Sequence, residues 1–272
     1  MILTDLWNLL LFQPLVNGLI LLYQLLGQNL GLAIIALTVI LRLLLSPLLL
    51  PSLKTAQKMK ELQPHLEKLK KKHANDKQAL AAAQLALYKE HGANPAAGCL
   101  PWIIQIIVLI ALYNAFNQIL AGKEDMLDQL NKLLYQPLRL SADTVFNTSF
   151  FYLNLTKPDL ISLPFALNLG FFTLDKIPGI FLIGAAITQF YSSKIMMPQT
   201  VAAQKLAKKT PKKEDDMATA MQQQMLYLMP IMTIVIGFSF PSGLVLYWLA
   251  LSLAMLGQQL LINKQTGVKK HG

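Results

Sequence analysis

A single arginine, Arg42, lies inside an apolar run from Leu30 to Leu50 that carries no other formal charge. The run is long enough for a helix that crosses a bilayer. A guanidinium at that depth costs at least ~2.5 to 3.5 kcal/mol on insertion scales, so it normally faces a hydrated or polar cavity instead of lipid. Thr38 lies one helical turn earlier, on the same face. The pair predicts a polar stripe inside the membrane. The alternative is that Arg42 extends toward the nearer membrane surface, roughly 12 Å away along the helix.

The composition indicates a membrane protein with several spans. Hydrophobic residues make up 54% of the chain and charged residues only 14%, which is unusual for a soluble domain of this length. Five apolar windows have about the length of a spanning helix, although the fourth is shorter. We expect transmembrane helices at 29–51, 98–120, 177–197, 224–240 and 243–263. An odd number of spans places the two termini on opposite sides of the membrane.

The distribution of basic residues predicts the orientation of these spans. The segment 52–97 carries nine lysines, the loop 198–223 carries five, and the tail 264–272 carries three. The segment 121–176 instead balances five basic residues against six acidic ones. Because positive charge is enriched on the cytoplasmic side, we expect the lysine-rich segments and the C-terminus inside, and the N-terminus and the 121–176 loop outside.

Residues 1–28 admit two interpretations. Their apolar content is sufficient for a span, but four polar side chains fall within a narrow arc of a helical wheel: Gln13, Asn17, Gln24 and Gln28. Such an arc is typical of an amphipathic helix that lies in the membrane interface. No lysine or arginine precedes the run, so it lacks the basic region of a signal peptide. We therefore expect an N-terminal interfacial helix, with a sixth span as the alternative.

The cytoplasmic segment 52–97 reads as a helical hairpin. Its two arms, about 53–73 and 76–91, are dominated by good helix formers, and we expect Asp76 to cap the second arm. Pro64 should kink the first arm, and we expect the hairpin to hinge at Pro51, Ser52 and the Asn94–Gly98 linker. A basic patch lies in the first arm and consists of Lys68, Lys70, Lys71 and Lys72. The patch is either a solvated face or a contact surface for lipid headgroups or a partner.

Several short strings along the chain resemble one known family. They are Leu62-Gln63-Pro64, Tyr88-Lys89, Asn94-Pro95-Ala96-Ala97-Gly98-Cys99, Met221-Gln222-Gln223-Gln224-Met225, and Phe240-Pro241-Ser242-Gly243-Leu244-Val245-Leu246-Tyr247-Trp248. In this order, and together with Thr38 and Arg42, they resemble the YidC-type membrane protein insertases over residues 14–263. That family is related to mitochondrial and chloroplast insertases. The large folded domain that precedes the core in relatives from two-membrane bacteria has no counterpart here, so we expect a minimal form.

The resemblance implies an all-α integral membrane protein. Five transmembrane helices would enclose a hydrophilic groove that is open to the cytoplasm and to lipid and closed on the outside. The family's groove arginine falls on Arg42, and a substrate-contacting threonine falls on Thr38. The expected substrate-binding groove comprises Arg42, Thr38, Gln189, Trp248, Tyr247 and Gln105. Gln105 is included for its polarity alone and fits core packing equally well, while Trp248 also fits an aromatic belt.

The implied function is that of an insertase and chaperone for nascent membrane proteins in the bacterial plasma (inner) membrane. It would act alone or with the Sec translocon, and its other expected partners are the ribosome and anionic lipids, but not DNA. No phosphate-binding glycine loop and no metal-spaced His or Cys cluster occurs in the sequence, so we expect neither a cofactor nor a metal, and not an enzyme. The alternatives are a small anion channel or secondary transporter that uses Arg42, and a non-catalytic translocon accessory. Transporters commonly contain internal repeats, which this chain lacks.

Overall fold

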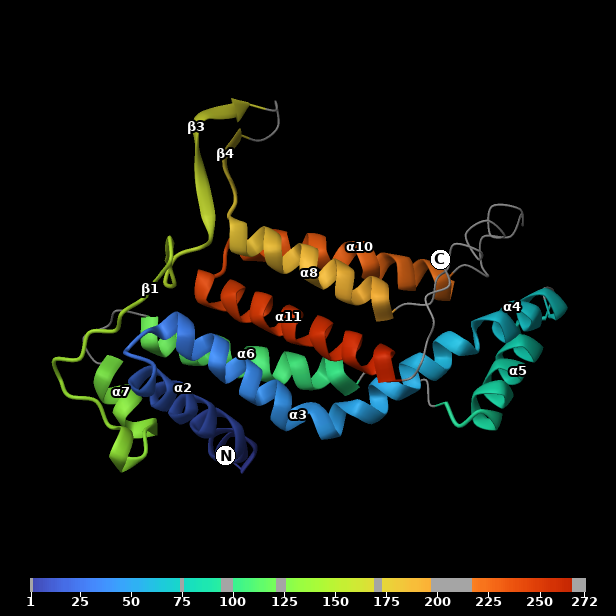
Figure 1. Cartoon of the computed structure of the whole chain (residues 1–272), viewed down its shortest axis with the longest axis horizontal. Coiled ribbons are helices and arrows are strands. Elements are labelled where there is room, and N and C mark those ends of the chain that lie inside the picture. Colours follow the sequence, from blue (N-terminus) through green and yellow to red (C-terminus); the bar gives the residue numbers. More distant parts are fainter. Residues whose placement is uncertain are drawn as a thin grey trace.

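The computed structural model describes residues 2–73, 76–93, 100–120, 126–168, 173–196 and 217–265. Long helices lie side by side in one bundle, a pair of shorter helices extends from one end, and a pair of strands projects near the other end (Figure 1). The bundle helices are α2 (Gln13–Leu25), α3 (Leu30–Glu61), α6 (Leu100–Leu120), α8 (Ile180–Met196), α10 (Met217–Gly237) and α11 (Ser242–Gln265). Among these, α11 packs most extensively against α8 and α3.

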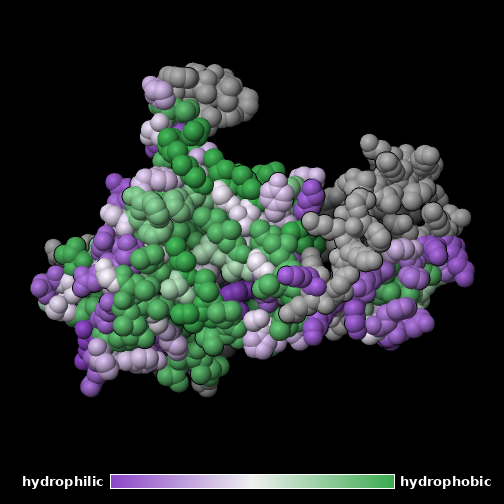
Figure 2. All heavy atoms as spheres, viewed as in Figure 1, coloured by the Kyte–Doolittle hydropathy of each residue, from purple (hydrophilic) through white to green (hydrophobic). Residues whose placement is uncertain are grey.

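Within the described residues, three helical stretches are long and apolar enough to cross a membrane: Asp5–Leu25, Leu30–Ser52 and Ser242–Ile262. Three further helices are apolar but shorter: Ile103–Ile119, Ile180–Ile195 and Leu226–Gly237. The surface of the bundle is predominantly hydrophobic, and hydrophilic residues concentrate toward its ends (Figure 2). These features agree with a helical membrane protein, because a lipid-facing helix exposes apolar side chains and satisfies its backbone internally. That the chain crosses the membrane five times stays a prediction.

The N-terminal helices pack on the bundle through both apolar and polar side chains. Helix α1 (Ile2–Trp7) and a π-helical turn (Asn8–Phe12) lead into α2. Asn17 of α2 is buried, donates to the carbonyl of Leu133 (2.9 Å) and accepts from the amide of Tyr135 (2.7 Å). Gln13 donates to the same Leu133 carbonyl. Two of the four polar side chains of the arc therefore contact protein instead of lipid headgroups. The helix Asp5–Leu25 is also long and apolar enough to span a membrane, so the interfacial placement of residues 1–28 stays a prediction.

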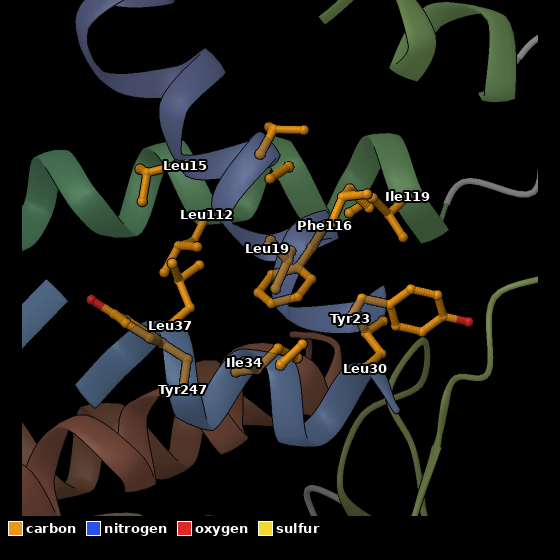
Figure 3. Close-up of a cluster of buried hydrophobic side chains, with 14 of the residues drawn as sticks. Leu15, Leu19, Tyr23, Leu30, Ile34, Leu37, Leu112, Phe116, Ile119 and Tyr247 are labelled. Atoms are coloured by element: carbon orange, nitrogen blue, oxygen red, sulfur yellow. The ribbon is translucent and has the colours of Figure 1, made fainter. Parts of the chain in front are cut away.

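The apolar core lies where α2, α3, α6 and α11 meet. Figure 3 shows side chains from all four helices converging in this cluster. The labelled members are Leu15, Leu19 and Tyr23 of α2, Leu30, Ile34 and Leu37 of α3, Leu112, Phe116 and Ile119 of α6, and Tyr247 of α11. All of them are buried. This cluster fixes how α3 and α11 face each other, and so it positions the polar residues described below.

Helix α3 runs well past the expected membrane boundary. It continues to Glu61 with Pro47 and Pro51 inside it, and it changes direction along its length (Figure 1). A proline inside a helix removes one backbone hydrogen bond and bends the helix without ending it. The expectation that Pro51 and Ser52 interrupt the helix is therefore wrong, and the break in the described helices comes at Leu62. Hinging of the hairpin at these residues stays a prediction.

Beyond Leu62 the chain forms a two-helix hairpin. Helix α4 (Gln63–Lys72) begins with Pro64 in its first turn, so this proline starts a helix instead of kinking one. Helix α5 (Lys77–Glu90) begins at Asp76, whose carboxylate accepts from the amide of Ala79 (2.9 Å), as expected for its cap. Leu62 and Leu66 are buried, while Lys68 and Lys72 are exposed. The expected linker at 94–98, most of the 198–223 loop and the end of the tail lie outside the described residues.

The 126–168 and 173–179 segments contain strands, which an all-α fold does not include. Helix α7 (Met126–Leu133) and a 3-10 turn (Gln136–Leu138) are followed by β1 (Ser149–Phe150) paired with β2 (Leu153–Asn154), and by β3 (Leu160–Asn168) paired with β4 (Thr173–Pro178). Both pairs are antiparallel. Outside the helices, backbone groups need other partners, and short hairpins supply them. The all-α expectation is thus correct for the bundle but not for this segment.

This segment also caps two bundle helices. The buried carboxylate of Asp159 accepts from the amide of Leu182 (2.8 Å) and from the Tyr152 hydroxyl (2.8 Å), and that hydroxyl accepts from the amide of Ile180 (2.8 Å). Burial, followed by the hydrogen bond to Asp159, raises the pKa of Tyr152, which keeps its hydroxyl protonated and able to donate. Because the first amides of a helix have no partner within it, these side chains satisfy the start of α8.

The start of α11 is satisfied in a similar way by backbone carbonyls. The amide of Ser242 donates to the carbonyl of Lys157 (2.7 Å), and the amide of Gly243 donates to that of Leu155 (3.2 Å). Phe150 packs so closely on Gly31 of α3 that a Cβ there would overlap its ring. The segment from Phe150 to Asp159 therefore joins the same ends of α3, α8 and α11. We call it the outer cap, after the side of the membrane on which the lysine distribution predicts it.

We expect Asp159→Ala to destabilise the protein by about 1 to 3 kcal/mol, because it leaves the buried amide of Leu182 without an acceptor. Tyr152→Phe removes only the hydroxyl and should cost less. The measurement is thermal unfolding of the purified protein in lipid nanodiscs. Asp143→Ala, at an exposed position of the same segment, is the matched control. An unfolding temperature unchanged by Asp159→Ala would contradict the capping role.

We expect the α4–α5 hairpin to open more readily than the bundle, because it contacts the rest of the described chain chiefly where α4 meets α3. Hydrogen exchange in nanodiscs should be faster in residues 63–90 than in residues 30–50 of α3. Exchange in the hairpin as slow as in that part of α3 would indicate a rigidly docked hairpin.

Candidate functional site

The polar face of α3 consists of three side chains spaced one turn apart. Thr38, Arg42 and Ser46 follow each other at intervals of four residues, so they line one side of the helix. Thr38 is buried, and its hydroxyl donates to the carbonyl of Ile34 on its own helix (2.6 Å). A threonine that bonds in this way satisfies its hydroxyl locally, and it leaves its methyl group for packing.

The guanidinium of Arg42 is held by a residue from another helix. Its Nε donates to Oε1 of Gln258 in α11 (2.9 Å), and Nε2 of Gln258 donates to the Ser46 hydroxyl (3.0 Å). The chain of bonds leaves α3 at Arg42, passes through α11 and returns to α3 one turn later. Arg42 is neither buried nor fully exposed. The guanidinium is therefore partly solvated by protein groups. The rest of it is accessible to any molecule in the adjacent space.

A second polar pair lies near Arg42 and joins α6 to α11. Nε2 of Gln105 in α6 donates to the hydroxyl of Tyr247 in α11 (2.7 Å). Tyr247 is buried with only 2% of its surface exposed. Because its ring belongs to the apolar core while its hydroxyl meets Gln105, Tyr247 forms the boundary between the core and the polar site.

Some of these groups line a small hollow between α3, α6 and α11, with an internal volume of about 20 Å³. We call it the α3–α11 hollow. Its walls are formed by Thr38, Leu41, Arg42, Leu45, Leu49, Ile104, Gln105, Val108, Tyr247 and Leu251. Apolar side chains dominate, and a few polar groups and one cation converge on the same space. A hollow of this size, with polar groups in its wall, has room for about one water molecule.

Four of the six expected groove residues meet in this hollow, and two lie elsewhere. Arg42, Thr38, Gln105 and Tyr247 line it together.

Gln189 instead accepts from the hydroxyl of Thr233 (2.6 Å), which joins α8 to α10. Trp248 is half-buried and stacks on Phe240, which stacks in turn on Tyr113. These contacts give Gln189 a role in helix packing and give Trp248 an aromatic setting near the outer cap.

Ser46 and Gln258 complete the site, although the sequence analysis did not identify them. The signal was present in both cases. Ser46 continues the Thr38 and Arg42 spacing by one more turn, and Gln258 is one of a few polar residues in a mainly apolar expected span. What the sequence does not contain is the rotation of α11 about its axis, which decides whether Gln258 or its neighbour Gln259 meets α3.

The basic patch lies on the hairpin, away from the hollow. Lys68 and Lys72 are exposed on α4, and Lys70 and Lys71 belong to the same helix. In the described part of the chain no group of three or more His, Cys, Asp or Glu residues is arranged to hold a metal ion.

Comparisons with known proteins agree along nearly the whole chain. Residues 21–270 match a protein family described as 60Kd inner membrane protein. The chain is 32% identical over 237 residues to the membrane protein insertase YidC of Fusobacterium nucleatum, covering 87% of each protein. It is 31% identical over 248 residues to the membrane protein insertase YidC of Oceanobacillus iheyensis, covering 90% of this chain and 78% of the relative. It is 30% identical over 269 residues to the membrane protein insertase MisCA of Bacillus subtilis, covering 97% and 82%.

If the α3–α11 hollow contains water, a cysteine in its wall should react with a membrane-impermeant thiol reagent, since the thiolate that reacts needs a polar environment. In a Cys99→Ser background, Leu251→Cys should be labelled from the lysine-rich side of the membrane and not from the other side. Leu253→Cys is the matched control, because Leu253 lies two residues further along α11 and is exposed on the apolar surface. Equal labelling of the two cysteines would contradict the presence of water in the hollow.

Proposed function

This chain belongs to the 60Kd inner membrane protein family, the YidC-type membrane protein insertases, and from that premise we propose that it inserts nascent membrane proteins through the α3–α11 hollow. The chain is a membrane protein insertase. Its family is not a class of catalytic enzymes, and its substrates are nascent membrane proteins. The observation that carries the proposed route is the guanidinium of Arg42, which lies in the wall of a largely apolar hollow.

In the proposed topology, α3, α6, α8, α10 and α11 span the membrane, and the N-terminal helices lie at the outer interface. The hollow forms part of a hydrophilic groove that opens to the cytoplasm. The lysine counts support this orientation, because the hairpin, the 198–223 loop and the tail share the positive charge. The N-terminus is then outside and the C-terminus inside, in the bacterial plasma membrane.

The insertion step follows from the cost of moving polar groups through hydrocarbon. A segment that must reach the outer side carries backbone amides, and often carboxylates, that lose their hydration in lipid. A hydrated groove shortens the distance that these groups travel without water. Arg42 attracts the carboxylates part of the way across the membrane, and the flanking apolar segment then partitions sideways into lipid, which releases the substrate.

Closure on the outside is the proposed role of the outer cap. The segment from Phe150 to Asp159 bonds to the ends of α8 and α11 and packs against α3. Phe240, two residues before the capped start of α11, stacks on both Trp248 and Tyr113. A groove that ends against these groups holds water on the inner side without becoming a continuous pore.

The proposed partners bind on the cytoplasmic side. The exposed Lys68 and Lys72, with Lys70 and Lys71 in the same helix, form a basic surface suited to the ribosome or to anionic lipid. The Sec translocon is a further proposed partner, as in the expectation from the sequence.

We expect Arg42→Ala to reduce insertion of a substrate with an acidic outer segment by about tenfold, which corresponds to about 1.4 kcal/mol of lost attraction. Arg42→Lys should keep most of the activity, because it keeps the positive charge. The measurement is insertion by the purified protein in liposomes, with one acidic substrate and the same substrate neutralised as its control.

Equal insertion of the acidic substrate by Arg42→Ala and by the parent would contradict the attraction. The same liposomes separate the other functions considered for this sequence. Movement of a small anion without substrate insertion would indicate a channel or transporter, and a lack of both activities would indicate a translocon accessory.

A further inference from the structure

We propose that Gln258 is a positioning residue that holds the guanidinium of Arg42 inside the α3–α11 hollow and presents its two terminal amino groups to the carboxylate of a substrate. This inference rests on the proposed function, in which Arg42 attracts acidic segments. Gln258 and Ser46 together keep the guanidinium of Arg42 at its depth in the membrane.

The direction of the bonds follows from the chemistry of the groups. A guanidinium has only N–H donors, so the amide oxygen of Gln258 must face Arg42. The amide nitrogen then points to Ser46, whose hydroxyl oxygen accepts at 3.0 Å. Both polar ends of the Gln258 side chain are therefore used, and its orientation is determined by two positions on α3.

Without this restraint Arg42 has a better-solvated alternative. A long charged side chain near a helix end extends along the helix until its charge reaches the interface. Leu43, Leu44 and Leu48 of α3 are all exposed on the apolar surface and offer such a path. The bond from Nε to Gln258 holds the guanidinium on the opposite, polar side of α3.

The same bond determines which edge of the guanidinium remains for a ligand. A carboxylate can bind a guanidinium through two parallel hydrogen bonds, either from Nε and one terminal nitrogen or from the two terminal nitrogens. Gln258 occupies Nε at 2.9 Å. Among the described residues, none accepts from the terminal nitrogens. The second mode is therefore the one that remains, and it suits an aspartate or glutamate of the substrate.

The first experiment tests the bond without any substrate. The chain contains only two arginines, Arg42 and Arg139, so nitrogen-15 spectra of the protein in nanodiscs contain two Nε–H signals. Arg139 is exposed in the 126–168 segment and is the internal reference. The Nε–H of Arg42 should exchange with water about tenfold more slowly than that of Arg139, because it is hydrogen-bonded away from bulk solvent.

Gln258→Leu should remove this protection. Gln259→Leu is the matched control, since it makes the same change one position further along α11, at a buried residue that forms no described bond to Arg42. Unchanged exchange at Arg42 in Gln258→Leu would overturn the proposal, as would equal loss of protection in the two variants.

The second experiment measures liposome insertion of the acidic substrate and of its neutralised counterpart. Gln258→Leu should reduce insertion of the acidic substrate about fivefold and leave the neutral one unchanged, because the charge is misplaced but the bundle is intact. Gln258→Glu should reduce it further, since a carboxylate there binds Arg42 and competes with the substrate. An equal loss for both substrates would show a structural role for Gln258 and overturn the proposal.

The outcomes for Arg42 and Gln258 can be told apart. Arg42→Ala could reduce insertion of the acidic substrate while Gln258→Leu and Gln258→Glu leave it unchanged. In that case the positioning role of Gln258 fails and the proposed function stands. If Arg42→Ala still inserts the acidic substrate as well as the parent does, the proposed attraction by Arg42 fails, and the role of Gln258 in substrate selection fails with it.

Discussion

The interaction on which this structure depends is the solvation of one permanent charge inside an apolar helix. A guanidinium cannot lose its charge in a protein, so it must be met by water or by polar groups wherever the fold places it. In this chain Gln258 of α11 meets Nε of Arg42, and Ser46 holds Gln258 in place. The facing surfaces of α3 and α11 therefore have to leave a polar opening beside their apolar contact, and the α3–α11 hollow is that opening.

A similar requirement shapes the opposite end of the bundle. The first amides of α8 and α11 need acceptors, and Asp159, Tyr152 and the carbonyls of Leu155 and Lys157 provide them. In the proposed route, this difference between the two ends matters. The fully paired polar groups would close one end of the groove, while the remaining donors of Arg42 would receive a substrate at the other.

Part of this arrangement was predictable from local sequence. The spacing of Thr38 and Arg42 indicated a polar face on one helix, and Asp76 was recognisable as a cap because helix starts have a short-range signature. The end of the helix was misplaced at Pro51 because a proline can either end a helix or bend it, and the packing around it decides which. The strands β3 and β4 were missed because a segment judged only by its charge balance gives no pairing register.

The sequence by itself determined that the chain belongs in a membrane, that one arginine lies within an apolar helix, and that recognisable strings follow one family's order. These properties depend on composition and on spacing along one helix. Only the tertiary structure decided which distant residues meet Arg42. Gln105, Gln189 and Gln258 are all polar residues in apolar helices, yet Gln258 alone bonds to it among the described residues. The reason is that the rotation and depth of one helix against another come from the packing of all the side chains between them.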